Sequence, residues 1–400
     1  MKKTLLLGLI CLTAYVPAIA QWDIVPNNLT ENVVDVVASD TTELFVVGSN
    51  GSIYNSEDAG HTFQLTYDAT TDDKMKAFCS NTNIITRYAC GENGKVLEYT
   101  PSGWVEYTTP IANRLNDIYY VGELIGYAVG ENGTIIKTSD GGSNWNIVQS
   151  PTTQWLTSVY AFDQNNVKIV GDGGLVISTT NGGDSWSQTT IPGDWWLGSV
   201  WLNSPTTGWL SGTEGKLYQI NAEGYIEYPT ETTNGIVSLN IPFSNYGHGV
   251  GDNGYITRWN GVNWEAQVSP TTNWLNSVTS YYNSDNKSSV ANMYSYACGE
   301  NGTILSSTEL VTGINNPTGP SKRINLCPNP ASDNAFLVGL KENEKASVLI
   351  STVNGLIVAN MQLEYPLNVA IPVAELSNGI YIVTIKTSRG FFAEKLLVKH

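Results

Sequence analysis

The architecture of this chain follows from residues 130–138, Gly130-Glu131-Asn132-Gly133-Thr134-Ile135-Ile136-Lys137-Thr138. Asn132 and Gly133 tolerate the positive φ angles that a type I′ hairpin requires, so a tight turn joins two strands here. Around this turn we expect strands at 115–120, 126–129, 134–138 and 145–149. Helical periodicity is absent. The unit therefore predicts four short strands joined by hairpins.

The same glycine-bounded turn recurs seven times along the chain. The copies begin at Gly48, Gly91, Gly130, Gly171, Gly212, Gly251 and Gly299, which are 43, 39, 41, 41, 39 and 48 residues apart. A period of about 40 residues with four short strands per unit is typical of a β-propeller. We therefore predict an all-β chain in which residues 21–311 form a seven-bladed β-propeller.

The seventh unit lacks a fourth strand after Leu310, and the beginning of the chain supplies one. Residues 22–25, Trp-Asp-Ile-Val, resemble residues 145–148, Trp-Asn-Ile-Val, which are the fourth strand of the third unit. We predict that strand 22–25 completes the last blade. This closes the ring and leaves fewer open sheet edges.

The ends of the propeller are bounded by a leader and a linker. Residues 1–20 have the features of a signal peptide: Lys2 and Lys3, an apolar run over 4–12, and Ala-Ile-Ala at 18–20. The run is too short to span a bilayer, and we predict no transmembrane segment in the chain. Residues 312–323 are rich in Gly, Asn and Pro and are predicted to be a flexible linker before a domain at 324–400.

Charge makes one class of partner improbable. The chain has 20 basic and 36 acidic residues; residues 1–20 hold 2 of the basic ones, and residues 312–400 hold 8 basic and 6 acidic ones. That leaves 10 basic and 30 acidic residues in 21–311, a net charge of about −20. Such a domain repels phosphate backbones, so we expect no nucleic-acid partner. The simplest role of these acids is to keep an exported protein soluble.

Four cysteines follow the leader: Cys79, Cys90, Cys298 and Cys327. Their spacing matches no zinc motif, so we expect no metal site. Cys79 and Cys90 flank a predicted hairpin and can face each other, and an oxidising compartment allows a disulfide between them.

Two resemblances follow from motifs. Thr138-Ser139-Asp140-Gly141-Gly142-Ser143-Asn144-Trp145 fits the Asp-box pattern Ser/Thr-x-Asp-x-Gly-x-Thr-Trp, and the turns at 56–63 and 179–186 share it. With the Gly-x-Asn-Gly turns, residues 21–311 resemble propellers of the photosystem II stability/assembly-factor type. The resemblance implies that the Asp-box is a structural hairpin on the rim.

The second resemblance covers the last domain. Its motifs are Cys327-Pro328-Asn329-Pro330, Val353-Asn354-Gly355, Leu376-Ser377-Asn378-Gly379-Ile380-Tyr381 and the terminal Lys395-Leu396-Leu397-Val398. This is similar to the C-terminal sorting domain of type IX secretion substrates of Gram-negative bacteria, although the family has Tyr at the position of Cys327. The resemblance implies a small β-sandwich, recognition by the type IX secretion machinery, and passage through the periplasm to the cell surface or the medium.

Some Asp-box families are hydrolases, so an enzyme is one possible function of this chain. A sialidase site needs three converging arginines, yet Arg87 precedes a second strand, Arg114 precedes a first strand and Arg258 lies late in a third, so we expect them not to share one face. The sequence shows no nucleophile motif, no phosphate-binding loop and no cofactor motif, so we predict no catalytic residues and no cofactor. A carboxylate pair suited to glycoside hydrolysis stays open, because 30 acids are present and no spacing singles one pair out.

The strand order places the loop before each first strand and the turn between the second and third strands on one face, at the mouth of the central channel. This face predicts a ligand site whose members are Trp155, Trp196, Trp274, Arg114, Lys74, Glu92, Glu131 and Glu300. Exposed tryptophans suit stacking on sugars or anchoring of a protein partner. The alternative is that the tryptophans pack between the blades and the acids are solvated.

These observations favour a non-catalytic, exported protein whose propeller binds a protein or a glycan. The alternative from another class is a polysaccharide-active glycoside hydrolase with a carboxylate pair on the same face. A third, assembly-factor role is an analogy with the photosynthetic relatives only, because fold alone does not give function.

Overall fold

The computed structural model describes residues 21–69, 74–79, 87–100, 102–122, 124–193, 196–283, 290–312, 325–327, 331–332, 334–338, 345–352, 356–363, 370–387 and 390–400. The expected signal peptide at 1–20 lies outside these residues, as does all of the expected linker except Thr312. No helix in the described ranges combines the length and the apolar character needed to cross a bilayer.

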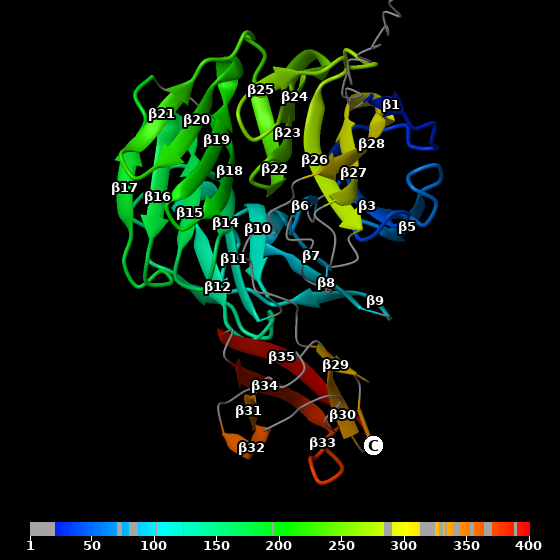
Figure 1. Cartoon of the computed structure of the whole chain (residues 1–400), viewed down its shortest axis with the longest axis vertical. Helices are drawn as coiled ribbons and strands as arrows, with labels where there is room; N and C mark the ends of the chain where they lie inside the picture. The colour runs from blue at the N-terminus through cyan, green and yellow to red at the C-terminus, as the bar shows by residue number, and fades with distance from the viewer. Residues whose placement is uncertain are drawn as a thin grey trace, which may run out of the picture.

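Seven four-stranded antiparallel sheets surround a central axis (Figure 1). Blade 1 consists of β2 (Val33–Ala38), β3 (Leu44–Gly48), β4 (Ile53–Ser56) and β5 (Gln64–Tyr67). Blade 2 consists of β6 (Met75–Phe78), β7 (Arg87–Gly91), β8 (Val96–Thr100) and β9 (Gly103–Tyr107). Blade 3 consists of β10 (Leu115–Val121), β11 (Ile125–Gly130), β12 (Ile135–Thr138) and β13 (Asn146–Ile147). Blade 4 consists of β14 (Leu156–Ala161), β15 (Val167–Gly171), β16 (Leu175–Thr179) and β17 (Ser187–Thr190).

The remaining blades repeat this order. Blade 5 consists of β18 (Leu197–Ser204), β19 (Thr207–Gly212), β20 (Leu217–Asn221) and β21 (Gly224–Tyr228). Blade 6 consists of β22 (Ile236–Phe243), β23 (Tyr246–Gly251), β24 (Ile256–Trp259) and β25 (Trp264–Ala266). Blade 7 consists of β26 (Leu275–Asn283), β27 (Val290–Gly299), β28 (Ile304–Thr312) and β1 (Asp23–Ile24). The all-β propeller is confirmed, and seven sheets are consistent with the seven predicted blades.

The turn that defines the repeat is built as its sequence requires. In blades 2 to 7 it is a short 3-10 turn, named η1 (Glu92–Gly94), η2 (Glu131–Gly133), η3 (Asp172–Gly174), η4 (Thr213–Gly215), η5 (Asp252–Gly254) and η6 (Glu300–Gly302). In η2 both central residues have positive φ, 55° at Asn132 and 67° at Gly133. The Thr134 N–H donates to the Glu131 carbonyl over 3.0 Å, which completes a type I′ turn.

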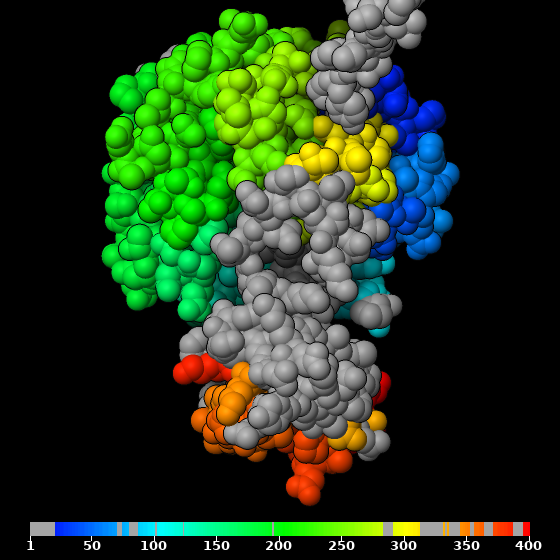
Figure 2. Space-filling model, in the orientation of Figure 1, coloured from blue at the N-terminus to red at the C-terminus, as the bar shows by residue number. Residues whose placement is uncertain are grey.

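The first residues of the described chain complete blade 7. In β1, Asp23 pairs with Ser306 and Ile24 with Leu305, and the Val25 N–H donates to the Ile304 carbonyl over 2.8 Å. The strand is therefore shorter than the expected 22–25. Figure 1 shows β1 beside β28, and Figure 2 shows the blue N-terminal residues adjoining the yellow ones of this blade on the surface.

Innermost strands carry a repeated irregularity that joins neighbouring blades. In all seven, the pairing register shifts after the first residue of the strand. In blade 3, Leu115 pairs with Gly130 and the next pair is Asp117 with Val129. The third residue then accepts a hydrogen bond from the next blade in several places: Phe78 N–H to Asp35 (2.6 Å), Val159 N–H to Asp117 (2.8 Å), Leu239 N–H to Ser199 (3.2 Å) and Val278 N–H to Ser238 (3.2 Å).

The C-terminal domain consists of two sheets on one apolar core. A three-stranded sheet has the order β29 (Asn325–Cys327), β30 (Asn334–Val338), β33 (Ala370–Pro372). A four-stranded sheet has the order β32 (Ile357–Leu363), β31 (Ala346–Thr352), β34 (Gly379–Thr387), β35 (Gly390–Val398). Ala335 and Ile371 of the first sheet pack with Val348 and Val383 of the second, as in a β-sandwich.

Candidate functional site

A ring of backbone hydrogen bonds fixes the candidate site at the channel mouth. In every blade, the residue before the innermost strand offers its carbonyl to the N–H of the first turn residue. The seven bonds are Ser49 to Asn32 (2.7 Å), Glu92 to Lys74 (2.8 Å), Glu131 to Arg114 (3.0 Å), Asp172 to Trp155 (3.1 Å), Thr213 to Trp196 (3.1 Å), Asp252 to Gly235 (3.0 Å) and Glu300 to Trp274 (3.0 Å). The loops and turns therefore lie on one face, and their side chains alternate around the mouth.

Three tryptophans of this ring are exposed to solvent. The exposed fraction is 44% for Trp155, 37% for Trp196 and 51% for Trp274. Trp22 and Trp145, by comparison, are 2% and 6% exposed and belong to packed clusters between blades. The three ring tryptophans thus contribute little to the interior, and large apolar groups held on a surface by the fold mark a contact site.

Blades 2 to 4 carry a network of paired charges on this face. The Arg114 guanidinium lies 3.4 Å from a Glu131 carboxylate oxygen and 3.9 Å from one of Glu92. Lys76 lies 3.6 Å from the same Glu92 oxygen. The Arg114 guanidinium also stacks 4.8 Å above the centre of the Trp155 ring. Lys76 was not among the predicted residues; its place on the inner strand, next to an acidic turn, is the signal that could have found it.

In blades 4 to 7, the hydrogen bonds that the acidic side chains of the turns accept come mainly from backbone N–H groups. Burial raises the pKa of Asp172 above its usual range. One Asp252 oxygen accepts the Gly235 N–H over 3.0 Å, and one Glu300 oxygen accepts the Trp274 N–H over 3.3 Å. The face is therefore divided between a matched half, where Arg114 pairs with acids and stacks on Trp155, and a tryptophan half, which has Trp196, Trp274 and carboxylates. Lys74 is half-buried in the matched half.

A cavity of about 530 Å³ opens in the tryptophan half. Its lining residues are Val34, Trp196, Thr213, Gly235, Val237, Asp252, Trp274, Leu275 and Asn276. Val34, Val237 and Asn276 are second residues of innermost strands, so the cavity leads from the loops into the channel. This volume falls in the range of small-ligand and side-chain pockets.

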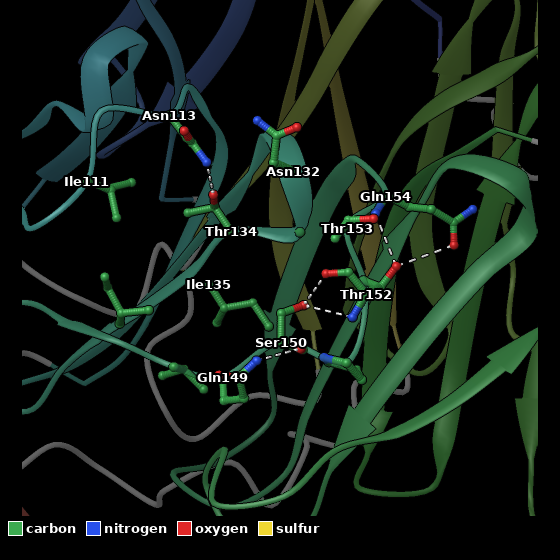
Figure 3. Close-up of a pocket in the computed structure, with 14 residues that line it drawn as sticks. Ile111, Asn113, Asn132, Thr134, Ile135, Gln149, Ser150, Thr152, Thr153 and Gln154 are labelled. Carbon is green, nitrogen blue, oxygen red and sulfur yellow. Dashed lines mark hydrogen bonds between the residues drawn. The ribbon is translucent and has the colours of Figure 1, made fainter.

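A second cavity, of about 730 Å³, lies beside the mouth between blades 3 and 4 (Figure 3). Its fourteen lining residues, all in the described ranges, include no charged side chain. The Asn113 amide donates to Thr134 over 2.7 Å, and the Ser150 hydroxyl donates to the Thr152 carbonyl over 3.1 Å. These hydrogen bonds join residues of the cavity lining to one another.

Two carboxyl groups lie deeper, on the inner strands of blades 1 and 3. Burial raises the pKa of Asp35 to about 6 and that of Asp117 to about 7, against the lowering effect of their backbone hydrogen bonds. The negative charge of Asp35 adds to the effect on Asp117. Four of the other blades have Ser158, Ser199, Ser238 and Ser277 at the equivalent position, so comparing the seven units could have singled out these aspartates.

The structure corrects the expectation of a disulfide. Cys79 and Cys90 are both buried thiols rather than a disulfide. The register shift after Met75 places Cys90 opposite Ala77, while the Cys79 N–H donates to the Tyr88 carbonyl, so the two cysteines are not cross-strand partners. Burial raises the pKa of the Cys90 thiol well above its usual range. In the described ranges, no group of three or more His, Cys, Asp and Glu side chains could hold a metal ion.

The three propeller arginines are held in separate places. Arg258 of β24 bonds the Glu309 carboxylate with two nitrogens, and the Arg87 Nε donates to the Ser39 hydroxyl over 2.8 Å. Arg114 lies in the channel-mouth network. This arrangement does not provide the arginine cluster that a sialidase needs.

The Asp-box turns use their polar groups internally. Asp140 accepts the Thr138 hydroxyl over 2.8 Å, the Asn144 N–H over 2.9 Å and the Asn144 amide over 2.6 Å. Asp58 in blade 1 is bonded in the same way, and the Thr62 hydroxyl holds the pKa of its carboxyl at about 2. These turns join third and fourth strands, so they lie on the face opposite the mouth.

Asp140→Ala is expected to lower the free energy of unfolding by about 1–2 kcal/mol and to leave ligand binding unchanged, because the turn loses several hydrogen bonds far from the mouth. Urea denaturation measures the loss. Ser143→Ala is the matched control, since its hydroxyl contacts only the Asp140 carbonyl in the same turn. A loss of binding by a folded Asp140→Ala protein would give the box a functional role.

Two family models match the sequence. Residues 97–224 match the model described as photosynthesis system II assembly factor YCF48, and residues 325–399 match a secretion system C-terminal sorting domain. No curated protein matches the sequence.

Solved structures with the same fold come from several families. YCF48 from Cyanidioschyzon merolae is 15% identical with a TM-score of 0.55, over 72% of this chain and 98% of that one. A structure of YCF48 bound to a D1 peptide is 16% identical with a TM-score of 0.57, over 72% and 94%. Virginiamycin B lyase from Staphylococcus aureus is 14% identical with a TM-score of 0.59, over 73% and 99%. At these identities the likeness shows the fold alone.

Proposed function

Since this chain joins a YCF48-like β-propeller to a type IX secretion sorting domain, which implies export to the cell surface or beyond, we propose that it is a non-catalytic binding protein that recognises a polypeptide at its channel mouth. The observation that carries the proposal is the set of three exposed tryptophans at equivalent ring positions. Aromatic anchors on a rigid frame supply most of the free energy at protein interfaces. YCF48, a relative in fold, has been solved with a bound peptide.

The acids of the mouth support binding over hydrolysis. Glu92 and Glu131 are paired with Arg114, and Asp252 and Glu300 accept backbone N–H groups. A glycoside hydrolase needs one carboxyl group that gives a proton and a second that acts as base or nucleophile across the scissile bond. The geometry favours no such pair on this face.

A peptide array and a glycan array, probed with the mature chain 21–400, test the proposal. We expect peptides to bind, and the triple variant Trp155→Ala, Trp196→Ala, Trp274→Ala to lose the binding while its melting temperature stays near that of the wild type, because the three side chains are exposed. Val262→Ala, which truncates a 73%-exposed side chain in the β24–β25 turn on the opposite face, is the matched control.

Three results would contradict the proposal. If the protein bound glycans and no peptide, its partner would be a glycan rather than a polypeptide. Release of reducing ends from a bound polysaccharide would establish the hydrolase instead. Unchanged binding by the triple variant would move the site away from the mouth.

A further inference from the structure

One position of the mouth ring has no side chain. Gly235 stands in the ring between Trp196 and Trp274, and the cavity of about 530 Å³ lies over it. Asp252 borders the same cavity, and its carboxylate is held there by the Gly235 N–H at 3.0 Å. The cavity thus has two indole rings in its wall and a carboxylate beside its glycine.

The protein fills the equivalent place in blade 3 with a cation. Arg114 occupies the ring position that Gly235 occupies in blade 6. Its guanidinium lies 4.8 Å above the ring of Trp155, the ring residue of the next blade, and 3.4 Å from Glu131 of its own turn. A guanidinium between an indole face and a carboxylate gains from both cation–π attraction and ion pairing.

The two places correspond residue by residue. Asp252 stands where Glu131 stands in its blade, and both donate their backbone N–H to the ring carbonyl over 3.0 Å. Trp274, in the blade after Gly235, takes the position of Trp155. Blade 6 therefore presents the indole and the carboxylate of this arrangement, with open space in place of the arginine.

We propose that the cavity over Gly235 binds an arginine side chain of the polypeptide partner, with the guanidinium on the face of Trp274 and beside Asp252. This deepens the proposed function and rests on it, because it names the group that the mouth recognises. The charge of the propeller region, about −20, attracts a cationic segment. Trp196 closes the other side of the cavity.

The first test uses N-acetyl-arginine amide as the probe and the neutral isostere N-acetyl-citrulline amide as its control. Binding to the mature chain is followed by NMR of the ¹⁵N-labelled indole N–H groups, with the Trp274 signal assigned from Trp274→Ala. We expect saturable shifts of the Trp274 signal with the arginine probe and at least about tenfold weaker binding of the citrulline probe. Equal binding of the two probes would overturn the proposal.

Variants then locate the site. Trp274→Ala and Asp252→Asn are each expected to weaken binding of the arginine probe by roughly five- to tenfold. Val262→Ala is expected to bind as the wild type does. Wild-type affinity in both Trp274→Ala and Asp252→Asn would overturn the proposal.

The variant Gly235→Arg would place an arginine of the protein itself in the cavity that we propose for the arginine of the partner. A Cβ at this position would lie too close only to the end of the Asp252 side chain, at 2.8 Å, which can turn aside; the Thr213 backbone at 3.6 Å is in ordinary contact, and the backbone conformation suits any residue. We expect Gly235→Arg to fold and to block the probe, and Gly235→Ala, which moves Asp252 equally but leaves the cavity open, to bind the probe no more weakly than Asp252→Asn does. Full binding by a folded Gly235→Arg protein would refute the site.

The failure of this proposal differs from failure of the proposed function. If a peptide partner binds at the tryptophans, and its affinity is the same for Asp252→Asn and Gly235→Arg as for the wild type, the proposed function stands and the arginine site is wrong. If no peptide on the array binds, the function fails, whatever the small probes show.

Discussion

Replacing Trp22 with alanine is expected to destabilise the propeller by about 3–5 kcal/mol. Trp22 is 2% exposed. It packs in a cluster that unites blades 6 and 7, with Val250 and Ile256 on one side and Leu275 and Leu305 on the other. Its ring lies 5.0 Å from that of His248 in an edge-on contact.

The matched control for this variant is the same substitution two residues later. Ile24 belongs to β1 but is 53% exposed, so Ile24→Ala is expected to change the free energy of unfolding by less than about 0.5 kcal/mol. Deletion of residues 21–27 should cost more than Trp22→Ala, because it also removes the pairing with β28 and the Asn27 bond to the Gly302 carbonyl. A melting temperature unchanged by the deletion would show that blade 7 is stable with three strands.

Asp117→Ser is expected to remove a strong pH dependence from the stability of the protein. The pKa of Asp117 is raised from 3.8 to about 7 in the folded state, so the folded protein binds a proton that the unfolded chain releases between these values. The unfolding free energy supplied by this group is therefore fully present below pH 3.8 and is lost as the pH rises through 7, a loss of roughly 2–4 kcal/mol.

Urea denaturation at pH 4.5, 6 and 8 measures this effect. The wild type should lose stability relative to Asp117→Ser as the pH rises, because serine holds the equivalent position in blades 5 and 6 without a charge and still accepts the N–H of the next blade. Asp35→Ser, with a folded pKa of about 6, should show a smaller change that ends at a lower pH. Parallel pH curves for the wild type and Asp117→Ser would mean that Asp117 is already ionised at pH 4.5 in the folded protein.

The fold was predictable from the sequence because its information is local and repeated. Asn132 and Gly133 define a turn by their backbone preferences alone, and seven such turns at a regular period leave few architectures. The ring of backbone hydrogen bonds then explains why Trp155 and Trp274, far apart in the chain, occupy equivalent places.

What could not be predicted depends on contacts between blades or on a shifted register. The stacking of Arg114 on Trp155 joins residues of two units, and no pattern within one unit encodes it. The sequence does not identify Gly235 as a site residue, because its part in the site is to leave space for a ligand and it has no side chain that could indicate this. The predicted disulfide between Cys79 and Cys90 is absent from the structure, because the shift of the pairing register after Met75 changes which residues of the two strands face each other.

The pairing of β1 with β28 has a consequence for the time course of folding. Asp23 pairs with Ser306, so the first strand to be synthesised has a partner that is made among the last of the propeller. At 5–20 residues per second, the intervening chain takes roughly 15–60 s to emerge from the ribosome. Contacts between such distant residues also form slowly, because a long loop must close first. The ring therefore cannot close before β28 has been synthesised, and the nascent propeller stays open until then.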